Sequence, residues 1–153
     1  MKIRTKPRES SNLLMCLHFF LGIGAVIGGL ILMIDPTGEM IDMPASMLVN
    51  SPFEHFFIPG FILLTCLGVF PILIATALKK RWNWELAKKL NLYQDKHWSW
   101  AFSLYCGFAL IIWITVQVYM INTVSLIHVF YMLLGILIQI VTLLPQVQRK
   151  YQV

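Results

Sequence analysis

The segment KKRWNWELAKKLNLYQDK, residues 79–96, lies between two long apolar runs and contains six of the twelve Lys and Arg residues of the chain. The other six lie before the first apolar run or after the last one: Lys2, Arg4, Lys6, Arg8, Arg149 and Lys150. The two remaining connections between apolar runs contain no basic residue. Because basic residues that flank membrane spans stay on the cytoplasmic side, this pattern predicts four transmembrane helices with both chain ends inside.

The composition also indicates a membrane protein. The chain has 153 residues, of which 58% are hydrophobic and 12% charged, whereas about 25% of the residues in soluble domains are charged. A span takes about 20 residues, and the predicted spans cover about residues 13–34, 56–78, 100–121 and 124–145. We therefore expect an all-α, four-helix membrane bundle that forms one domain over residues 1–153.

The net charge of +5 does not indicate a nucleic-acid partner. The basic residues lie next to span ends, where the negative surface of the membrane attracts them. The lipid bilayer is therefore the first expected partner.

The first apolar run, residues 13–34, is too long for the apolar region of a cleaved signal peptide, so we expect it to remain as a span. It contains a G-x-x-x-G pattern at Gly24 and Gly28. Such a pattern lets a second helix approach closely, which predicts tight packing on this face of the first span.

The outer loop between the first two spans is expected to be structured. The sequence D-P-T-G at residues 35–38 is typical of a turn. The following residues are rich in Met, Ile and Leu, which predicts that the loop folds over the outer end of the bundle. The sequence S-P-F-E at residues 51–54 predicts a capping box, with Ser51 as the N-cap and Pro52 as the first residue of the second helix.

The other connections have different characters. The inner linker, residues 79–96, mixes Trp and Leu with its lysines, which predicts a short amphipathic helix at the inner membrane surface. Within the second span, Pro59 and Pro71 are expected to bend the helix. Only Asn122 and Thr123 clearly separate the last two spans, which predicts an antiparallel hairpin.

Polar residues, with one glycine among them, recur at three- or four-residue steps in the fourth span and form a similar stripe in the third. Those of the fourth span are Ser125, His128, Tyr131, Gly135, Gln139 and Thr142, and those of the third are Ser99, Ser103, Cys106, Trp113 and Gln117. This spacing puts each set on one helix face, which should point into the bundle because polar groups facing lipid are unfavourable. The favoured interpretation is interhelical hydrogen bonding that sets the packing.

A second interpretation is a polar pocket at the outer end of the bundle. Its candidate residues all lie near the outer ends of the predicted helices: Asp35, Glu54, His55, Gln117 and His128. Such a pocket would bind a small molecule or a lipid headgroup. His and carboxylate groups also bind zinc, but the spacing matches no known ligand pattern. We therefore expect no metal ion and no cofactor.

Several classes of membrane protein fit poorly. Cys16, Cys66 and Cys106 lie singly in three spans, whereas thiol oxidoreductases need outward-facing cysteine pairs. The first span lacks the carboxylate that small multidrug exporters carry there, and the histidines are not paired at one depth as a haem bundle requires. No span contains a central charged residue, which argues against ion-coupled transport.

Several short motifs give the chain a resemblance to known proteins. These are D-P-T-G at 35–38, M-P at 43–44, S-P-F at 51–53, I-P-G at 58–60 and W-I-x-x-Q at 113–117. At these motifs the chain resembles a widespread group of small bacterial four-helix integral membrane proteins of unassigned function. The resemblance implies a four-helix architecture and a place in the bacterial cytoplasmic membrane. It implies no activity and no site residues, and the inner linker is longer than is usual in that group.

From these observations we expect a non-enzymatic accessory or interaction protein, although an enzyme is left open. Its partner would be another membrane protein or a second copy of the chain. The partner would bind to the lipid-facing helices, the glycine-rich first span or the outer loop. The alternative is a protein that binds a small ligand or lipid in the outward-facing polar pocket.

Overall fold

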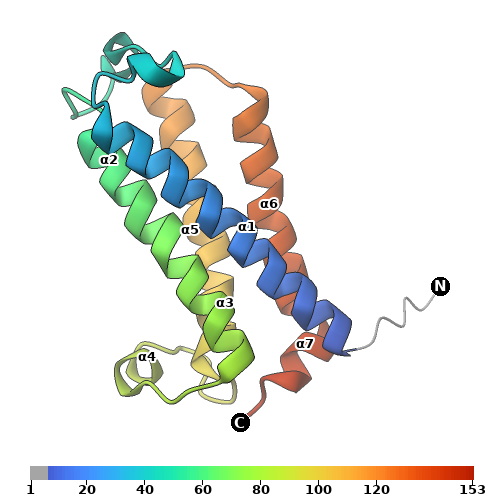
Figure 1. Cartoon of the computed structure of the whole chain (residues 1–153). Helices are drawn as coiled ribbons and strands as arrows, with labels where there is room; N and C mark the ends of the chain where they lie inside the picture. The colour runs from blue at the N-terminus through green and yellow to red at the C-terminus, as the bar shows by residue number, and fades with distance from the viewer. Residues whose placement is uncertain (1–6) are drawn as a thin grey trace.

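The computed structural model describes residues 7–153, so Lys2, Arg4 and Lys6 lie outside the described part of the chain (Figure 1). All of its regular elements there are helices. They are α1 (Pro7–Ile34), η1 (Glu39–Ile41), η2 (Ala45–Leu48), α2 (Phe57–Ile62), η3 (Leu63–Val69), α3 (Phe70–Lys80), α4 (Glu85–Lys89), α5 (Trp98–Ile121), α6 (Leu126–Leu143) and α7 (Pro145–Lys150).

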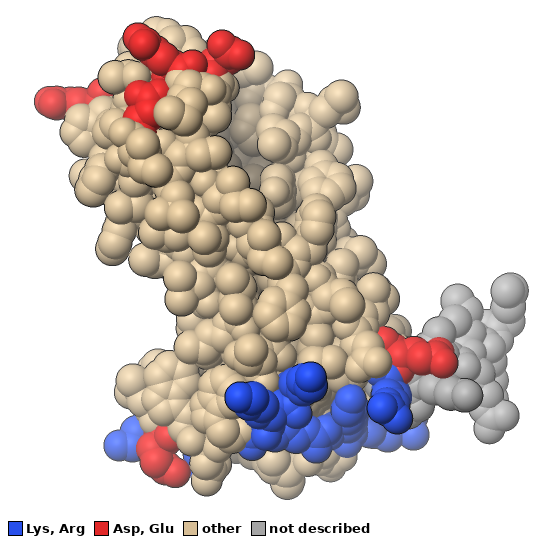
Figure 2. All heavy atoms as spheres, viewed as in Figure 1, with Lys and Arg blue, Asp and Glu red and all other residues tan. Residues whose placement is uncertain are grey.

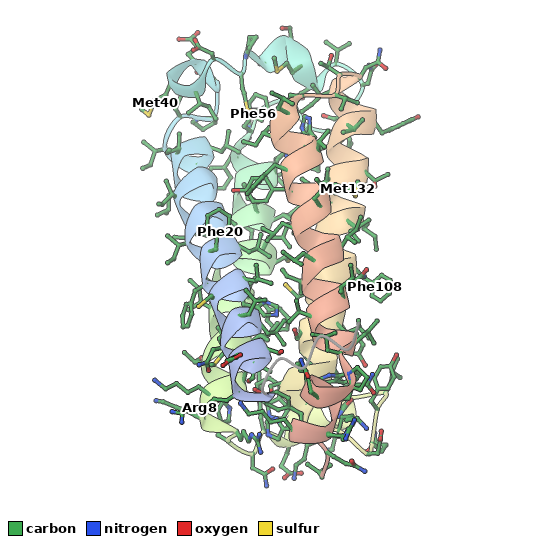
Figure 3. All side chains as sticks on the ribbon, turned by 90° about the vertical axis from the view of Figure 1, so that its right-hand side faces the viewer. Arg8, Phe20, Met40, Phe56, Phe108 and Met132 are labelled. Carbon is green, nitrogen blue, oxygen red and sulfur yellow. The ribbon has the colours of Figure 1, made fainter. Side chains whose placement is uncertain are left out.

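Four helical stretches are long and apolar enough to cross a membrane: Arg8–Ile34, Phe57–Lys80, Trp98–Ile121 and Leu126–Leu143. In each of them, no more than 39% of the most apolar stretch is buried inside the molecule. Many large apolar side chains, such as Phe20 and Phe108, are instead exposed along the flanks of the bundle (Figure 3). Four helices with this outward-facing apolar surface confirm a multi-pass membrane protein.

Charged residues gather at the two ends of the bundle (Figure 2). The basic end, as we call it, carries every described Lys and Arg residue, from Arg8 to Lys150, together with three carboxylates. The acidic end carries Asp35, Glu39, Asp42 and Glu54. The flanks between the ends bear no charged side chain of the described residues.

The first hairpin packs α1 against α2, η3 and α3 through glycines. A Cβ atom built on Gly29 would lie 2.7 Å from the carbonyl oxygen of Gly60, and one on Gly22 would lie 2.8 Å from that of Gly68. Any larger residue would push the two backbones apart. Gly22 and Gly29 are seven residues apart, almost two full helical turns, so they lie on the same face of α1.

The second hairpin packs α5 against α6 in a similar way. Gly107 and Gly135 face each other, and a Cβ atom on either would lie 3.1–3.2 Å from the carbonyl oxygen of the other. The turn between the helices uses Asn122 in the left-handed conformation, at φ 54°. His128 then accepts a hydrogen bond at Nδ1 from the backbone N–H of Ser125, over 3.1 Å, and so caps α6.

The second span contains a π-helical segment, η3, between its two prolines. Its widened turn ends where the N–H of Phe70 donates to the carbonyl of Thr65, five residues earlier. Pro71 follows directly and has no N–H to donate, and in an α-helix its ring would crowd the carbonyl four residues before it. The hydroxyl of Thr65 donates to the carbonyl of Phe61, over 2.8 Å, within the same distorted region.

The predicted capping box at the start of the second helix is wrong. The helix begins at Phe57 rather than Pro52. Ser51 Oγ accepts a hydrogen bond from the N–H of Phe53, 3.1 Å away, so it closes a local turn instead of capping a helix. The N–H of Phe56 donates to the carbonyl of Pro36, over 2.9 Å, which ties this segment to the start of the loop and delays the helix.

Loop and linker residues pack over both ends of the bundle. At the acidic end, Leu32, Leu48 and Phe56 form a separate apolar cluster under the loop. At the basic end, the indole N–H of Trp98 donates to the carbonyl of Trp82, over 2.9 Å, and packs the linker that contains α4 against α5.

Candidate functional site

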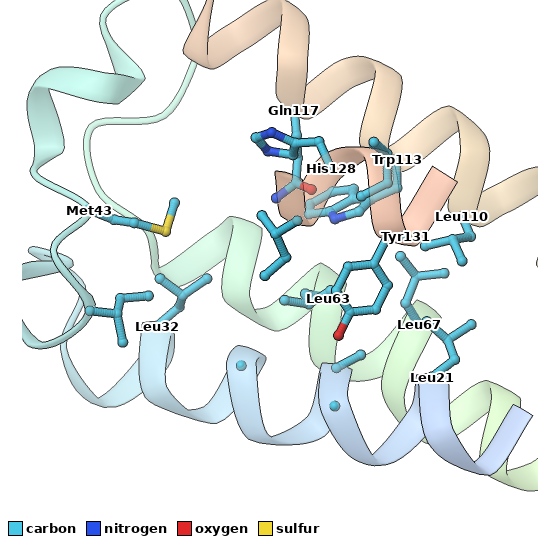
Figure 4. Close-up of a pocket in the computed structure, with 16 residues that line it drawn as sticks. Leu21, Leu32, Met43, Leu63, Leu67, Leu110, Trp113, Gln117, His128 and Tyr131 are labelled. Carbon is cyan, nitrogen blue, oxygen red and sulfur yellow. The ribbon is translucent and has the colours of Figure 1, made fainter. Parts of the chain in front are cut away.

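A cavity of about 260 Å³ lies between the two hairpins, in the half of the bundle nearer the acidic end (Figure 4). The first hairpin and the loop contribute Leu21, Gly24, Ala25, Gly28, Leu32, Ile41, Met43, Leu63 and Leu67 to its wall. The second hairpin contributes Leu110, Trp113, Ile114, Gln117, Ile127, His128 and Tyr131. Most of the wall is therefore apolar, and the polar side chains all come from α5 and α6.

The cavity exists because α1 presents glycines to it. Gly24 is two residues from Gly22, a rotation of about 200°, so Gly24 and Gly28 lie on another face of α1, and both line the cavity that Figure 4 shows. A Cβ atom on Gly28 would meet only Leu63, at 3.6 Å, which is an ordinary contact. The predicted tight helix contact is present at Gly24, where a Cβ atom would lie 3.0 Å from the hydroxyl oxygen of Tyr131 in α6, and absent at Gly28. These two glycines form one wall of the cavity.

The polar side chains of the cavity include hydrogen-bond donors. His128 accepts from the Ser125 N–H at Nδ1, so a neutral imidazole carries its proton on Nε2 and can donate there. The indole Nε1 of Trp113 is buried and has no hydrogen-bond partner in the described structure. A buried donor without a partner costs about 1–3 kcal/mol. Gln117 lies one helical turn from Trp113 and borders the same space.

Of the five predicted pocket residues, the structure brings Gln117 and His128 together at the cavity. Glu54 and His55 are exposed on the loop, and the ring of His55 packs edge-on against Phe57 with 6.5 Å between the ring centroids. Neither borders the cavity.

Asp35 organises its own turn. One carboxylate oxygen accepts hydrogen bonds from the N–H and the hydroxyl of Thr37, and the other accepts from the N–H of Met40 over 2.7 Å. The bond from the Thr37 hydroxyl, followed by that from Met40, lowers the pKa of Asp35. Its role in the structure is to shape the start of the loop.

Tyr131, Trp113 and the two glycines are cavity residues that the predicted pocket left out. Trp113 lies four residues before Gln117, and Tyr131 lies three residues after His128. Residues at these spacings share a helix face, so the predicted polar stripes already contained the signal for both. No comparable signal assigned Gly24 and Gly28 to a cavity.

A second polar cluster lies deeper, toward the basic end. Nε2 of His18 is 2.7 Å from Oγ of Ser103, which is 2.9 Å from Oγ1 of Thr142. Thr142 donates to the carbonyl of Ile138, so Ser103 donates to Thr142 and His18 donates to Ser103. All three side chains are fully buried. This chain of hydrogen bonds joins α1, α5 and α6 in the interior of the bundle.

Metal binding and disulfide bonds depend on where the His, Cys, Asp and Glu side chains of the described part of the chain lie. No three His, Cys, Asp or Glu side chains of residues 7–153 are placed to hold a metal ion. Cys16 and Cys66 are exposed on the flanks, Cys106 is buried, and all three are free thiols.

No protein-family model, no curated protein and no solved structure matches this chain significantly.

Proposed function

We propose that this protein is a non-enzymatic membrane protein that binds a small amphipathic molecule or part of a lipid in the cavity between its hairpins. The observation that carries the proposal is the make-up of the cavity: an apolar body with Gln117, His128 and Trp113 on one wall. Ligand sites typically combine a mostly apolar cavity with a few placed polar groups.

The size and chemistry of the cavity define the kind of ligand. An engineered apolar cavity of about 150 Å³ binds benzene, so about 260 Å³ accommodates a molecule of one or two rings or the end of a lipid chain. Among the described residues, no Lys, Arg, Asp or Glu borders the cavity, which argues against a charged group inside it. The donors at His128 and Trp113 call for a hydrogen-bond acceptor, such as a carbonyl, ether or hydroxyl oxygen.

The separation of charge supports a topology for this site. Basic residues flanking spans stay in the cytoplasm, so the basic end and both chain ends would lie inside and the cavity would lie nearer the outer leaflet. We propose the bacterial cytoplasmic membrane as the location, on the strength of the motif resemblance. The surrounding bilayer is then the source of a lipid ligand.

An interaction protein is the second candidate. The glycines of the first span are used inside the molecule, so they no longer support a partner site there. The turn between α5 and α6 still exposes apolar side chains, with Val124 64% and Leu126 88% accessible. A membrane-protein partner or a second copy could cover this turn.

Native mass spectrometry of the protein released from lipid nanodiscs tests the first proposal. The wild type should retain a small molecule or lipid of defined mass. Gly28→Leu should lose it, because the new side chain enters the cavity without a backbone clash. The matched control is Ala109→Leu, which adds a similar side chain on the exposed face of α5. Equal retention by both variants would refute the cavity as the binding site.

Gln117→Leu probes the polar wall of the same cavity. The substitution keeps the approximate size of the side chain and removes its donors and acceptor. A neutral hydrogen bond contributes about 0.5–1.5 kcal/mol, so ligand retention should fall about three- to tenfold while the protein stays folded. Unchanged retention would show that Gln117 takes no part in binding.

A further inference from the structure

Three basic residues from separate parts of the chain meet at the basic end. Arg8 lies in the first turn of α1, Arg81 follows α3, and Lys150 ends α7. Burial, followed by the positive charges of Arg81 and Arg8, lowers the pKa of Lys150. Arg81 contacts Lys150 directly, and α1, which begins beside Arg8, packs against α7, which ends at Lys150. Figure 2 shows basic side chains gathered on this side of the molecule. We call these three residues the basic cluster.

Tyr151 holds two of these cations in place. The guanidinium carbon of Arg81 lies 4.8 Å from the centre of the Tyr151 ring, and Nζ of Lys150 lies 5.8 Å from it. Arg81 also donates from Nη2 to the carbonyl of Lys150, over 2.8 Å. A cation over an aromatic face is attracted by the ring, so this arrangement is favourable despite the repulsion between the two cations.

Tyr151 is itself fixed by two spans. It is buried, and its hydroxyl donates to the carbonyl of Leu78 at the end of the second span, over 2.8 Å. The hydroxyl of Ser11, in α1, lies 2.7 Å from the hydroxyl oxygen of Tyr151. Because the Tyr151 proton is already donated to Leu78, Ser11 is the donor of this second bond. The ring that carries Arg81 and Lys150 is thus anchored to the bundle rather than to a loose chain end.

No member of the basic cluster makes an ion pair with a carboxylate of the described residues. The two ion pairs there join Lys88 to Glu85 and Lys96 to Asp95. Glu9 follows Arg8 but makes no ion pair with a described basic residue. Like charges held together create a local positive potential that favours an anion.

We propose that Arg8, Arg81 and Lys150 form a binding site for the phosphate of an anionic membrane lipid. Arg guanidinium groups bind phosphate oxygens through paired hydrogen bonds, and Lys adds a point charge. The site is distinct from the cavity between the hairpins and lies at the other end of the bundle, so it does not depend on the proposed function.

The depth of the cluster favours a lipid over free phosphate. Arg8 is the first residue of the Arg8–Ile34 span and Arg81 directly follows the Phe57–Lys80 span. Residues at span ends lie at the level of the lipid headgroups. Leu13, five residues beyond Arg8 in α1, is exposed and belongs to the apolar surface that faces the acyl chains of the bilayer.

Thermal unfolding in a mild neutral detergent tests this site with dioctanoyl phosphatidylglycerol as the probe. Dioctanoyl phosphatidylcholine and sodium phosphate at matched ionic strength are the comparison probes. The double variant Arg8→Gln/Lys150→Gln removes two charges, and it keeps Arg81 and the Lys150 carbonyl to which Arg81 donates. Lys89→Gln on α4 is the control, because it removes a basic residue at the same end that is exposed and outside the cluster.

We expect phosphatidylglycerol to raise the unfolding temperature of the wild type in a saturable way, and phosphatidylcholine to raise it far less. The double variant should weaken the apparent affinity for phosphatidylglycerol about tenfold or more, whereas Lys89→Gln should stay within about twofold of wild type. Native mass spectrometry should show phosphatidylglycerol adducts on the wild type and Lys89→Gln, and fewer on the double variant. This second measurement applies even if the double variant is too unstable to unfold cooperatively.

Three results would overturn the proposal. Equal weakening by Lys89→Gln and the double variant would show diffuse attraction to the whole basic end. Equal binding of phosphatidylcholine would show that charge is not recognised. Sodium phosphate that stabilises the wild type as strongly as the lipid would assign the cluster to free phosphate.

Discussion

Nε2 of His18 lies 2.7 Å from Oγ of Ser103, and this hydrogen bond joins the first hairpin to the second in the interior of the bundle. The two hairpins otherwise meet mainly through apolar side chains, and both line the cavity nearer the acidic end. The His18–Ser103 pair therefore fixes how the hairpins sit beside each other on the side away from the cavity.

Replacing Ser103 with Ala should destabilise the bundle. The change leaves Nε2 of His18 without an acceptor, while Nδ1 already lacks a partner in the described structure. Interhelical hydrogen bonds in membranes contribute about 0.6 kcal/mol on average and up to about 1.7 kcal/mol, and we expect the upper part of this range. Unfolding in a graded series of denaturing detergent measures the effect.

Thr115→Val serves as the control for this substitution. Its hydroxyl donates only to the carbonyl of Ile111 in its own helix and lies on an exposed face. The free energy of unfolding should change by less than about 0.5 kcal/mol. A Ser103→Ala protein as stable as Thr115→Val would show that the buried chain does not hold the hairpins together.

Two neighbouring glycines of α1 should respond in opposite ways to the same substitution. Gly29→Ala places a Cβ atom 2.7 Å from the Gly60 carbonyl oxygen, so it should destabilise by about 1–3 kcal/mol. Gly28→Ala meets only Leu63 at 3.6 Å, and it should be neutral or stabilise by up to about 1 kcal/mol through helix propensity. The measurement is the unfolding midpoint of both variants in one detergent series, and the reverse order would contradict the packing of the first hairpin.

The orientation in the membrane is a separate prediction. In a background with Cys16, Cys66 and Cys106 replaced, a cysteine at Glu39 should react with an impermeant thiol reagent added outside intact cells. A cysteine at Lys88 should react only after the membrane is opened, since the basic end is expected in the cytoplasm. Labelling of Lys88→Cys alone in intact cells would reverse the topology.

The turn at the acidic end should loosen in acid. Hydrogen bonds to the carboxylate lower the pKa of Asp35 from its ordinary value of 3.8, the first from Thr37 and the second from Met40. A lowered pKa means that the ionised form stabilises the folded turn above pH 3.8, and that this stabilisation is lost as the pH falls through the lowered pKa.

Amide hydrogen exchange of Met40 follows this change, after correction for the intrinsic pH dependence of exchange. Its protection should decrease at low pH in the wild type. Asp35→Asn should show weaker protection with little pH dependence, because the amide side chain keeps an acceptor but does not titrate. Constant protection of Met40 down to pH 2 in the wild type would show that the carboxylate does not hold the turn.

The four spans could be predicted because basic residues and apolar runs are properties of the sequence alone. The close contacts between helices could not be predicted in the same way. Gly22, Gly24, Gly28 and Gly29 all lie within two turns of one helix. Which of these glycines meets another backbone depends on which helix lies on each side. The sequence does not state that neighbour relationship, so it does not reveal that Gly22 and Gly29 are the glycines that meet another backbone.

The residues of the candidate site also divide into those on helices, which could be predicted, and those in the loop, which could not. Gln117 and His128 were placed at one level because helices have a fixed rise, and the structure brings both to the cavity. Asp35, Glu54 and His55 lie in or next to the loop, where side-chain directions depend on bonds such as that from Phe56 to Pro36. Short-range motifs do not reveal such a bond. The same bond also explains why the capping signal at Ser51 did not begin a helix.

The central claim is that the cavity beside Gln117 and His128 holds a ligand. A crystal structure of the protein grown from a lipidic mesophase, without added ligand, tests it most directly. We predict continuous non-protein density between α1 and α6, with an acceptor atom within hydrogen-bond distance of His128 Nε2. A cavity that contains only water, or one closed by inward movement of Tyr131 and Leu63, would contradict the claim.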